Sequence, residues 1–530
     1  MKQHRCPHKF TRRFWLRFFS CATGHGFRLG AVFGKRASKR YFKAGGGGAE
    51  FSSYFCGIVK RHSKKKHKYE VLTQLRVEEM AAEGKCISRH DNLVVFIADV
   101  APGDVVDVRV TKKRKNYLEA VPVHFHEYSE ARTQPFCEHF SVCGGCKWQH
   151  IPYETQLFYK QKQVNDNVER IGKITGHEML PILPSDRVSF YRNKLEFTFS
   201  DYAWLTKEQI DSGVDVDRRA LGFHIPMRFD KIVDVQHCYL QPAPSNEIRL
   251  AVKNYARENN LPFFDLVKQE GYLRNLIIRT ANTGDLMVIV QVFQDRMDWL
   301  QPLLDYLLLE FPQITSLQYV VNNKGNETFH DLEVVCYHGQ PYIHEQMEGL
   351  RFRVGPKSFY QTNSEQAYNL YKLTREFALL NGHETVYDLY TGAGTIANFV
   401  ARSAAQVVGI EYVASAIEDA KINSQINDIT NTHFYAGDMK DVLTDELFAR
   451  HGRPDVIITD PPRAGMHPDV VAKLLEVKAN RIVYVSCNPA TQARDLEMLA
   501  EQYDVVKIQP VDMFPQTYHV ESVALLSLRS

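Results

Sequence analysis

The stretch Tyr484-Val485-Ser486-Cys487-Asn488-Pro489-Ala490-Thr491 begins in an apolar run and ends in a tight polar turn. The run from 481 to 485 predicts a buried strand, and the Ser-Cys-Asn-Pro turn marks its end. A cysteine at that point lies at the C-terminal edge of the strand, where ligands bind in open α/β sheets. The stretch therefore predicts a reactive thiol at the ligand edge of an α/β sheet, rather than a packed core cysteine.

Two more predicted strands end in turns that suit a binding site. The acidic turn Asp460-Pro461-Pro462-Arg463 follows the apolar run 456–459, and a glycine-rich turn from Asp388 to Gly394 follows the run 385–387. Strand and helix patterns alternate over residues 356–530, which predicts a doubly wound, Rossmann-like sheet. Three such strand ends indicate one site that holds a cofactor and a nucleophile.

The residues around the glycine-rich turn favour S-adenosylmethionine as the cofactor. The next predicted strand, 407–411, ends in Glu411, whose carboxylate can accept hydrogen bonds from a ribose diol. A further strand at 432–435 is followed by Asp438, which could hold an adenine amino group. Position 397 is alanine, so the third glycine of a dinucleotide fingerprint is absent. Nicotinamide enzymes share the turn, but the combined pattern is more typical of a methyl donor site.

Three clustered cysteines predict a metal site. Cys137, Cys143 and Cys146 lie close together, with two glycines that let the backbone turn tightly between the last two. Cys238 is the preferred fourth ligand, and His139 and His150 are rivals. Four thiolates suit either Zn²⁺ or an iron–sulfur cluster, and the spacing does not decide between them. Ten cysteines in 530 residues are too few for a disulfide scaffold, which favours a reducing compartment.

The length of 530 residues predicts about three domains, preceded by a basic segment. Residues 1–70 contain 18 Lys and Arg against two Glu, a net charge of +16, which leaves −13 for the rest because the total is +3. This segment fits a disordered tail, an RNA-contacting arm or a mitochondrial transit peptide. Residues 71–127 predict a small β-barrel with strands at 93–97 and 105–110 and a basic loop at 111–117. Residues 128–355 predict a β-rich central domain that contains the cysteine cluster.

The predicted nucleophile suits methylation of a pyrimidine ring. A thiol that adds to C6 makes C5 nucleophilic, so that C5 can take a methyl group from a sulfonium, and a base must then remove the C5 proton. Cys487 is the natural nucleophile. Glu521, just before the final predicted strand, is the preferred base, with His519 as a rival. Asp460 could bind a polar edge of the base or the cofactor.

From about residue 72 onward the chain resembles the RNA uracil-C5-methyltransferase family, and within it the 23S ribosomal RNA enzymes of the RumA/RlmD type. The motifs Tyr191-Arg192-Asn193-Lys194 and 355–363 match the central and linking motifs of that family. The resemblance implies a class I methyltransferase domain at 356–530, an OB-like TRAM barrel at 71–127 and a [4Fe–4S] cluster in the central domain. The cluster ligands that it implies are Cys137, Cys143, Cys146 and Cys238.

The resemblance also implies roles for single residues of the C-terminal domain. Cys487 falls on the nucleophile of the family and Glu521 on its general base. The positions that fall on S-adenosylmethionine or active-site contacts are Gln361, Tyr390, Glu411, Asp438 and Asp460. Position 395 is often an asparagine that contacts the cofactor, and here it is Thr395.

These residues lead to the hypothesis of an enzyme that makes 5-methyluridine in 23S ribosomal RNA. The barrel and the cluster favour the ribosomal branch, since the transfer-RNA branch usually lacks both. A transfer-RNA enzyme, an amino-methyltransferase that uses Asp460-Pro461-Pro462-Arg463, and a non-catalytic iron–sulfur RNA-binding protein are the alternatives. No apolar run approaches the ~18 residues of a membrane span. We expect a cytoplasmic protein with RNA as its partner and no obligate protein partner.

Overall fold

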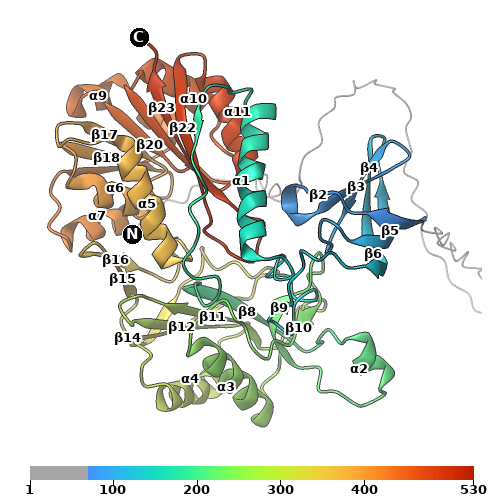
Figure 1. Cartoon of the computed structure of the whole chain (residues 1–530). Helices are drawn as coiled ribbons and strands as arrows, with labels where there is room; N and C mark the ends of the chain where they lie inside the picture. The colour runs from blue at the N-terminus through green and yellow to red at the C-terminus, as the bar shows by residue number, and fades with distance from the viewer. Residues whose placement is uncertain (1–69) are drawn as a thin grey trace, which may run out of the picture. The chain divides into compact units, whose positions relative to one another are not determined.

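The computed structural model describes residues 70–530, which belong to one compact unit of the chain. Three large β-sheets organise this part, as the ribbon view shows (Figure 1). The hypotheses for the basic segment 1–70 fall, apart from Glu70, outside the described residues.

The first sheet has six strands in the order β1-β5-β6-β4-β3-β2. Its strands are β1 (Val71–Arg76), β2 (Glu79–Met80), β3 (Cys86–His90), β4 (Leu93–Ile97), β5 (Val105–Lys113) and β6 (Tyr117–Glu127), with the short 3₁₀ helix η1 (Ala82–Gly84). The strands expected at 93–97 and 105–110 are confirmed. The basic loop expected at 111–117 is shorter, because β5 continues to Lys113 and β6 starts at Tyr117. Antiparallel pairing of β5 with β6 extends the hairpin to Lys113 and leaves only 114–116 as its tip.

The central sheet has seven strands in the order β10-β9-β8-β11-β12-β13-β14. They are β8 (Lys194–Ser200), β9 (Ala220–His224), β10 (Ile232–Val233), β11 (Leu273–Thr280), β12 (Leu286–Val292), β13 (Ser316–Val321) and β14 (Val335–Gly339). The apolar stripes of α3 (Ser245–Glu258) and α4 (Met297–Glu310) pack into one core with this sheet. The short helix α2 (Lys207–Asp211) and the hairpin of β15 (Ile343–Met347) and β16 (Leu350–Val354) complete this part.

The third sheet has eight strands in the order β19-β18-β17-β20-β21-β23-β22-β7. They are β7 (Glu178–Met179), β17 (Thr385–Leu389), β18 (Gln406–Glu411), β19 (Thr432–Ala436), β20 (Val456–Thr459), β21 (Arg481–Ser486), β22 (Tyr503–Val511) and β23 (Glu521–Leu528). The strands β17 to β21 pair in parallel, and β23 runs antiparallel to both of its neighbours. The expected doubly wound sheet is therefore present, with one reversed strand.

Helices cover both faces of the third sheet, so its central strands are apolar throughout. One face packs with α5 (Ser364–Ala378) and α6 (Thr395–Ala401). The other packs with α8 (Met439–Val442), α9 (Asp445–His451), α10 (Pro468–Val477) and α11 (Pro489–Leu499). Helix α7 (Ala414–Gln425) lies beside α6 and β19. This three-layer arrangement places the strand ends of β17, β18, β20 and β21 at one edge.

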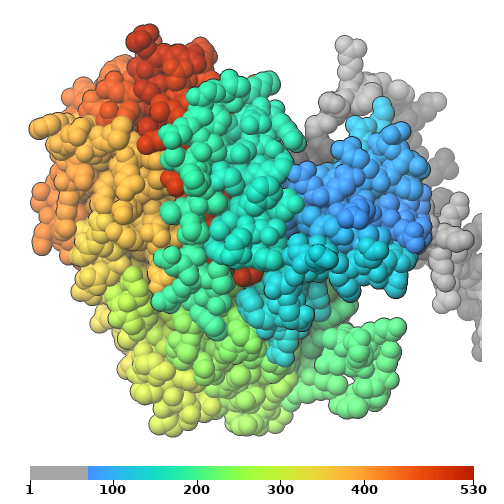
Figure 2. Space-filling model, viewed as in Figure 1, coloured from blue at the N-terminus to red at the C-terminus, as the bar shows by residue number. Residues whose placement is uncertain are grey.

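A segment from the predicted central region belongs to this third sheet instead. Helix α1 (Tyr153–Arg170) contributes Val164 and Val168 to the same core as α10 and α11. The short strand β7 pairs in parallel with β22 at the edge of the sheet. In the space-filling view the α1 segment covers this face, and atoms from the C-terminal end of the chain show at its border (Figure 2). The predicted central domain, 128–355, is thus continuous in sequence, but its segment with α1 and β7 packs with the third sheet.

Candidate active site and cysteine pocket

The strand ladder places Cys487 opposite Glu521. Ser486 pairs with Ser522 in the antiparallel ladder between β21 and β23. The ladder ends there, and continuing its register by one residue brings Cys487 next to Glu521, whose charge acts on the Cys487 thiol. Glu521 is only 3% exposed, whereas Cys487 is half-buried. The reversed direction of β23 therefore brings a carboxyl group to the thiol.

A second loop is fastened to the turn that carries Cys487. The Asn488 side chain caps α11 by accepting from the backbone N–H of Ala490, and its amide donates to the Arg463 carbonyl at 3.0 Å. The Thr491 hydroxyl donates to the same carbonyl at 3.2 Å. These bonds hold the Asp-Pro-Pro-Arg turn against the cysteine turn. The positive charge of Arg463 acts on both Cys487 and Glu521.

Burial shifts the pKa of four groups at this edge, Glu521, Asp460, Cys487 and His519. Burial and the neighbouring Asp460 raise the pKa of Glu521 to about 8, and burial raises the pKa of Asp460 to about 7. Burial and the two acids raise the pKa of the Cys487 thiol to about 12. Burial, together with Arg463, lowers the pKa of His519 to about 4, which makes it a weak base. Clustered perturbed groups at a sheet edge are typical of a catalytic site.

The raised pKa of Glu521 predicts a pH-dependent stability difference. Because the folded state binds this proton more tightly than the unfolded state, the carboxyl group destabilises the fold as pH rises from about 4.5 to about 8. When the pH is raised from 5 to 8.5, the free energy of unfolding of Glu521→Gln should therefore increase by a few kcal/mol relative to that of wild type. A tenfold change in proton affinity corresponds to about 1.4 kcal/mol. Urea unfolding at both pH values measures this. Glu497→Gln, on the surface of α11, is the control, and an equal gain in both variants would contradict the assignment.

Three of the predicted cofactor contacts come together beside this cluster. Tyr390, with φ of +62°, and Glu411 follow the neighbouring strands β17 and β18. The charges of Glu411 and Asp438 both act on Tyr390. Backbone N–H groups of Gly392 and Val413 donate to the Glu411 carboxylate at 3.2 and 2.9 Å, which fixes its orientation. Asp438 caps α8.

The other predicted contacts lie around the same edge. Asp460 directly follows β20, and its charge acts on the buried Asp388 that precedes the glycine-rich turn. Thr395 is buried at the first position of α6. The Gln361 carbonyl accepts from the Asn193 side-chain amide at 2.9 Å. Within residues 70–530 the side-chain amide of Gln361 forms no hydrogen bond.

The four cysteines predicted as ligands line one cavity of about 160 Å³. They come from the loops before α1 and before α3 and are Cys137, Cys143, Cys146 and Cys238. Burial raises the pKa of Cys146 to about 12, and the other three thiols add to this rise through their proximity. No group of three or more His, Cys, Asp or Glu side chains in residues 70–530 is compact enough to hold a single metal ion.

The two rival histidines are engaged elsewhere. The His139 ring accepts a hydrogen bond from the backbone N–H of Gln236 at 2.8 Å. The His150 ring lies 3.3 Å from the carbonyl of Val100, in the loop between β4 and β5, and does not line the cysteine cavity. His139 lines the cysteine cavity together with Cys238, whereas His150 does not, so geometry favours Cys238 over His150.

Sequence patterns missed several residues that support the site. The buried Lys160 of α1 forms an ion pair with the buried Asp512 at 2.6 Å and donates to the Phe514 carbonyl at 3.1 Å. The Tyr191 hydroxyl donates to the Pro515 carbonyl at 2.9 Å. Both contacts fix the loop that leads into β23 and Glu521. Their partners lie more than 300 residues apart, so no local pattern could have found them.

Known protein families and full-length relatives match this chain. The family described as tRNA (Uracil-5-)-methyltransferase matches residues 337–529, and the TRAM domain matches residues 72–123. A Bacteroides thetaiotaomicron protein described as an uncharacterized RNA methyltransferase is 60% identical over 454 residues, 85% of this chain and 100% of its own length. A Chlorobaculum tepidum protein of the same description is 39% identical over 463 residues, 86% of this chain and 95% of its own length.

A solved structure resembles nearly the whole described region. The tRNA (uracil-54, C5)-methyltransferase of Pyrococcus abyssi, in complex with S-adenosyl-L-homocysteine, aligns with a TM-score of 0.66 and 28% identity. The alignment covers 85% of this chain and 100% of that one. Sheet order, domain matches and full-length relatives agree, and the chain belongs to the family of S-adenosylmethionine-dependent RNA uracil-5-methyltransferases.

Proposed function

We propose that Cys487 and Glu521 perform the two halves of uridine C5 methylation. The Cys487 sulfur adds to C6, and the thiol proton passes to the Asp460 carboxylate, which leaves Glu521 ionised for the later step. The electron pair gained at C5 takes the methyl group from the sulfonium. The Glu521 carboxylate then removes the C5 proton, and the carbon–sulfur bond breaks to release the thiolate. The observation that carries this proposal is the pairing of Ser486 with Ser522, which brings the next residues, Cys487 and Glu521, together, so that the Glu521 charge acts on the thiol.

The methyl donor fits the neighbouring strand ends. Glu411 would accept from the ribose diol, Asp438 would face the adenine, and Tyr390 and Thr395 would border the same groove. Asp460 and the free amide of Gln361 are suited to the polar edge of the uracil. S-adenosylmethionine supplies the electrophilic methyl group at this edge. These residues orient it and keep it next to C5.

Glu521→Gln should stop the reaction after methyl transfer. Glutamine keeps the shape of the side chain but cannot accept the C5 proton, so the bond between Cys487 and C6 persists. We expect a stable RNA–protein adduct that migrates as a shifted band in a denaturing gel and carries the methyl label. Glu497→Gln should turn over normally. Full turnover by Glu521→Gln without an adduct would contradict the base assignment.

We propose that the cysteine cavity holds a [4Fe–4S] cluster rather than Zn²⁺. A cavity of about 160 Å³ bordered by four thiols suits a larger inorganic body, and thiolates are the ligands of such clusters. The cluster would tie the loop of Cys238 to the loop of Cys146. Methyl transfer itself needs no redox step.

The paired glycines offer a test of this assignment. A Cβ at Gly144 would lie 2.6 Å from the His224 carbonyl, so Gly144→Ala must displace the loop between the cysteines. A Cβ at Gly145 would lie 3.6 Å from the Cys143 sulfur, an ordinary contact. We expect anaerobically purified Gly144→Ala to lose most of its iron and visible absorbance, and Gly145→Ala to keep them. Zinc in place of iron in the wild-type protein would contradict the cluster proposal.

We propose 23S ribosomal RNA as the substrate, because the TRAM barrel and the cysteine cavity occur together in one chain. The Pyrococcus abyssi structure favours the transfer-RNA alternative, since an enzyme described as acting on tRNA covers the same length of chain. An amino-methyltransferase would need neither Cys487 nor its opposing carboxyl group. A non-catalytic RNA-binding protein would have no need for both the Cys487 thiol and its opposing carboxyl group. We further propose that the enzyme works in the cytoplasm, where its RNA substrates are found, and needs no protein partner.

The substrate can be identified directly. Anaerobically purified protein is incubated with S-adenosylmethionine and either transcribed 23S RNA or transfer RNA, and nucleosides from each digest are analysed by mass spectrometry. 5-Methyluridine in 23S RNA alone supports the ribosomal proposal. The product in transfer RNA alone keeps the mechanism and overturns the substrate. No 5-methyluridine in either, with cofactor bound, contradicts the proposed reaction on these RNAs.

A further inference from the structure

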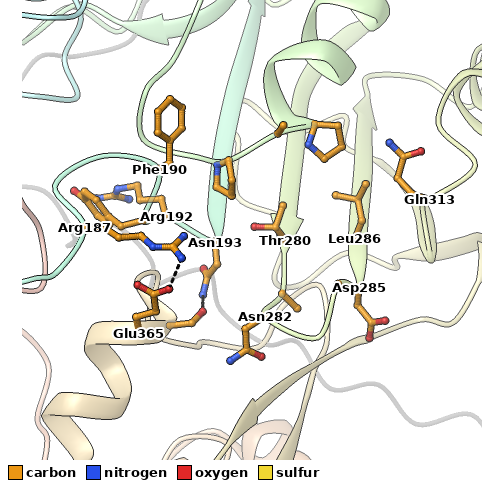
Figure 3. A pocket seen from close by; sticks show the side chains of 17 residues that line it. Arg187, Phe190, Arg192, Asn193, Thr280, Asn282, Asp285, Leu286, Gln313 and Glu365 are labelled. Atoms are coloured by element: carbon orange, nitrogen blue, oxygen red, sulfur yellow. Dashed lines mark hydrogen bonds and ion pairs between the residues drawn. The ribbon is translucent and has the colours of Figure 1, made fainter.

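A second cavity, of about 380 Å³, lies between the central sheet and the start of α5. Figure 3 shows Arg187, Arg192 and Phe190 on one side of it and Gln313 and Asp285 on the other. Its size is within the range of sites that bind a nucleotide-sized ligand. None of the roles proposed above uses this cavity.

The backbone presents Phe190 and Arg192 on the same side. Residues 190–192 pair with the loop that follows Cys238, since the N–H groups of Phe190 and Arg192 donate to the carbonyls of Tyr239 and Leu240 at 2.7 Å each. Tyr191, between them, is buried, and its hydroxyl donates to the Pro515 carbonyl. Phe190 has φ of +53°, a conformation that costs an aromatic residue about 1–3 kcal/mol. Such strain at a cavity wall points to a functional position for the ring.

An aromatic row leads along the surface to this cavity. The ring of Phe136, which is 41% exposed, lies 5.3 Å from that of Tyr239. The Tyr239 ring lies 5.9 Å from that of Phe190, which is half-buried. Aromatic rings next to cationic side chains are the usual platform for unstacked bases of single-stranded RNA.

Two guanidinium groups flank the end of this row. Arg187 is paired with Glu365 at 3.0 Å, but both side chains are more than half exposed, so the pair is weak. Arg192 lies over the Phe514 ring at 5.4 Å, and among the described residues it has no acidic partner. Arginine suits phosphate because its planar donors bind two oxygens at once.

The cavity adjoins the candidate active site. Asn193, on its wall, donates through its side chain to the Gln361 carbonyl at 2.9 Å. Arg192, also on the wall, acts electrostatically on His519, two residues before Glu521. Two residues of the cavity wall, Asn193 and Arg192, thus also contact or act on residues of the candidate active site.

We propose that this cavity binds an unstacked nucleotide of the substrate RNA adjacent to the target uridine. Its base stacks on Phe190, and its phosphate lies between Arg187 and Arg192. This inference rests on the proposed function, because the adjacent nucleotide is defined by the uridine at Cys487. It makes Phe190 a determinant of which RNA loops the enzyme accepts.

The test measures binding without turnover. The probe is a fluorescein-labelled, single-stranded RNA of twelve nucleotides with one central uridine, titrated into the Cys487→Ala protein with S-adenosylhomocysteine. We expect Phe190→Ala to bind about 5- to 150-fold more weakly, the loss that one base–aromatic stack gives. Phe190→Trp should bind the labelled RNA as tightly as the protein that keeps Phe190. Tyr306→Ala, which removes a half-buried ring stacked on Tyr255, is the matched control and should not change binding.

The phosphate contact has its own readout. For single-stranded RNA each neutralised phosphate contributes about 0.7 to the slope of log affinity against log salt. Arg187→Gln should lower this slope by about that amount. Arg450→Gln, another exposed arginine paired with a glutamate, should leave the slope unchanged. Equal slopes for Arg187→Gln and wild type would overturn the phosphate contact.

Methylation of full-length transcripts by proteins that keep Cys487 separates this inference from the proposed function. A raised KM with nearly unchanged kcat in Phe190→Ala supports the subsite. Normal methylation and normal RNA binding by Phe190→Ala overturn the subsite and leave the function intact. If the wild-type protein methylates no RNA but Phe190→Ala still weakens binding of the labelled RNA, the subsite stands and the proposed function fails. The subsite is overturned if Phe190→Ala and Tyr306→Ala weaken RNA binding equally. It is also overturned if Phe190→Trp weakens RNA binding as much as Phe190→Ala does.

Discussion

Replacing Cys487 with alanine is expected to abolish methylation, with turnover at least about 10⁴-fold below wild type, the scale on which loss of a covalent nucleophile acts. The reason is chemical, since without addition to C6 the C5 atom of uracil is too weak a nucleophile for a sulfonium. The measurement is single-turnover formation of 5-methyluridine with saturating RNA. Binding of the RNA and of S-adenosylhomocysteine should be unchanged, because Cys487 is half-buried at the end of a strand and supports no core packing.

Cys336→Ala is the matched control for this experiment. Cys336 is an exposed free cysteine in β14, away from the sheet edge that carries Cys487. Its variant should retain full activity. Methylation at the wild-type rate by Cys487→Ala would contradict uracil C5 chemistry and support methylation of an exocyclic amine, which needs no thiol.

Replacing Lys160 with methionine is expected to cost about 3–5 kcal/mol in free energy of unfolding, the usual cost of leaving one partner of a buried ion pair unpaired. Both Lys160 and Asp512 are inaccessible to solvent, and one oxygen of Asp512 has no other partner among the described residues. The loop before β23 would also lose the bond to the Phe514 carbonyl. Urea unfolding measures the loss of stability.

Two comparison variants sharpen this prediction. The double variant Lys160→Met/Asp512→Leu removes both charges and should recover most of the lost stability. Lys173→Met breaks an ion pair of the same length with Glu497, 2.6 Å, but on the surface, and should cost far less stability than Lys160→Met. Equal losses in Lys160→Met and Lys173→Met would contradict the role of the buried pair.

The sequence predicted the parts of the active site that depend on local pattern. The apolar runs before Asp388, Asp460 and Cys487 all form strands, and their turns meet at one edge because parallel strands share a direction. What local pattern could not supply was the pairing of β21 with β23 in reverse. Strand partners follow from the topology of the whole sheet, so the sequence placed Glu521 at the edge but not opposite the thiol.

The cysteine cavity shows the same limit. The spacing of Cys137, Cys143 and Cys146 is local and predicts a shared site. Cys238 lies far along the chain, and only its chemistry and a family resemblance suggested it. The backbone N–H of Gln236, two residues before Cys238, donates to the His139 ring at 2.8 Å and so ties the loop of this thiol to the loop of the other three. Sequence does not reveal that His150 lies outside the cysteine cavity, beside the Val100 carbonyl, whereas His139 lines the cavity.

Helix α1 and strand β7 have a consequence for attempts to isolate the catalytic part. A fragment that starts at residue 356 would contain Cys487, Glu521 and most of the proposed cofactor contacts. It would nevertheless uncover the apolar stripe where Val164 and Val168 meet α11, and it would leave β22 as a free edge. Uncovered edges and apolar stripes invite aggregation. Truncation should therefore begin near residue 150, with the central sheet retained as an insertion inside the folding unit that contains the catalytic sheet.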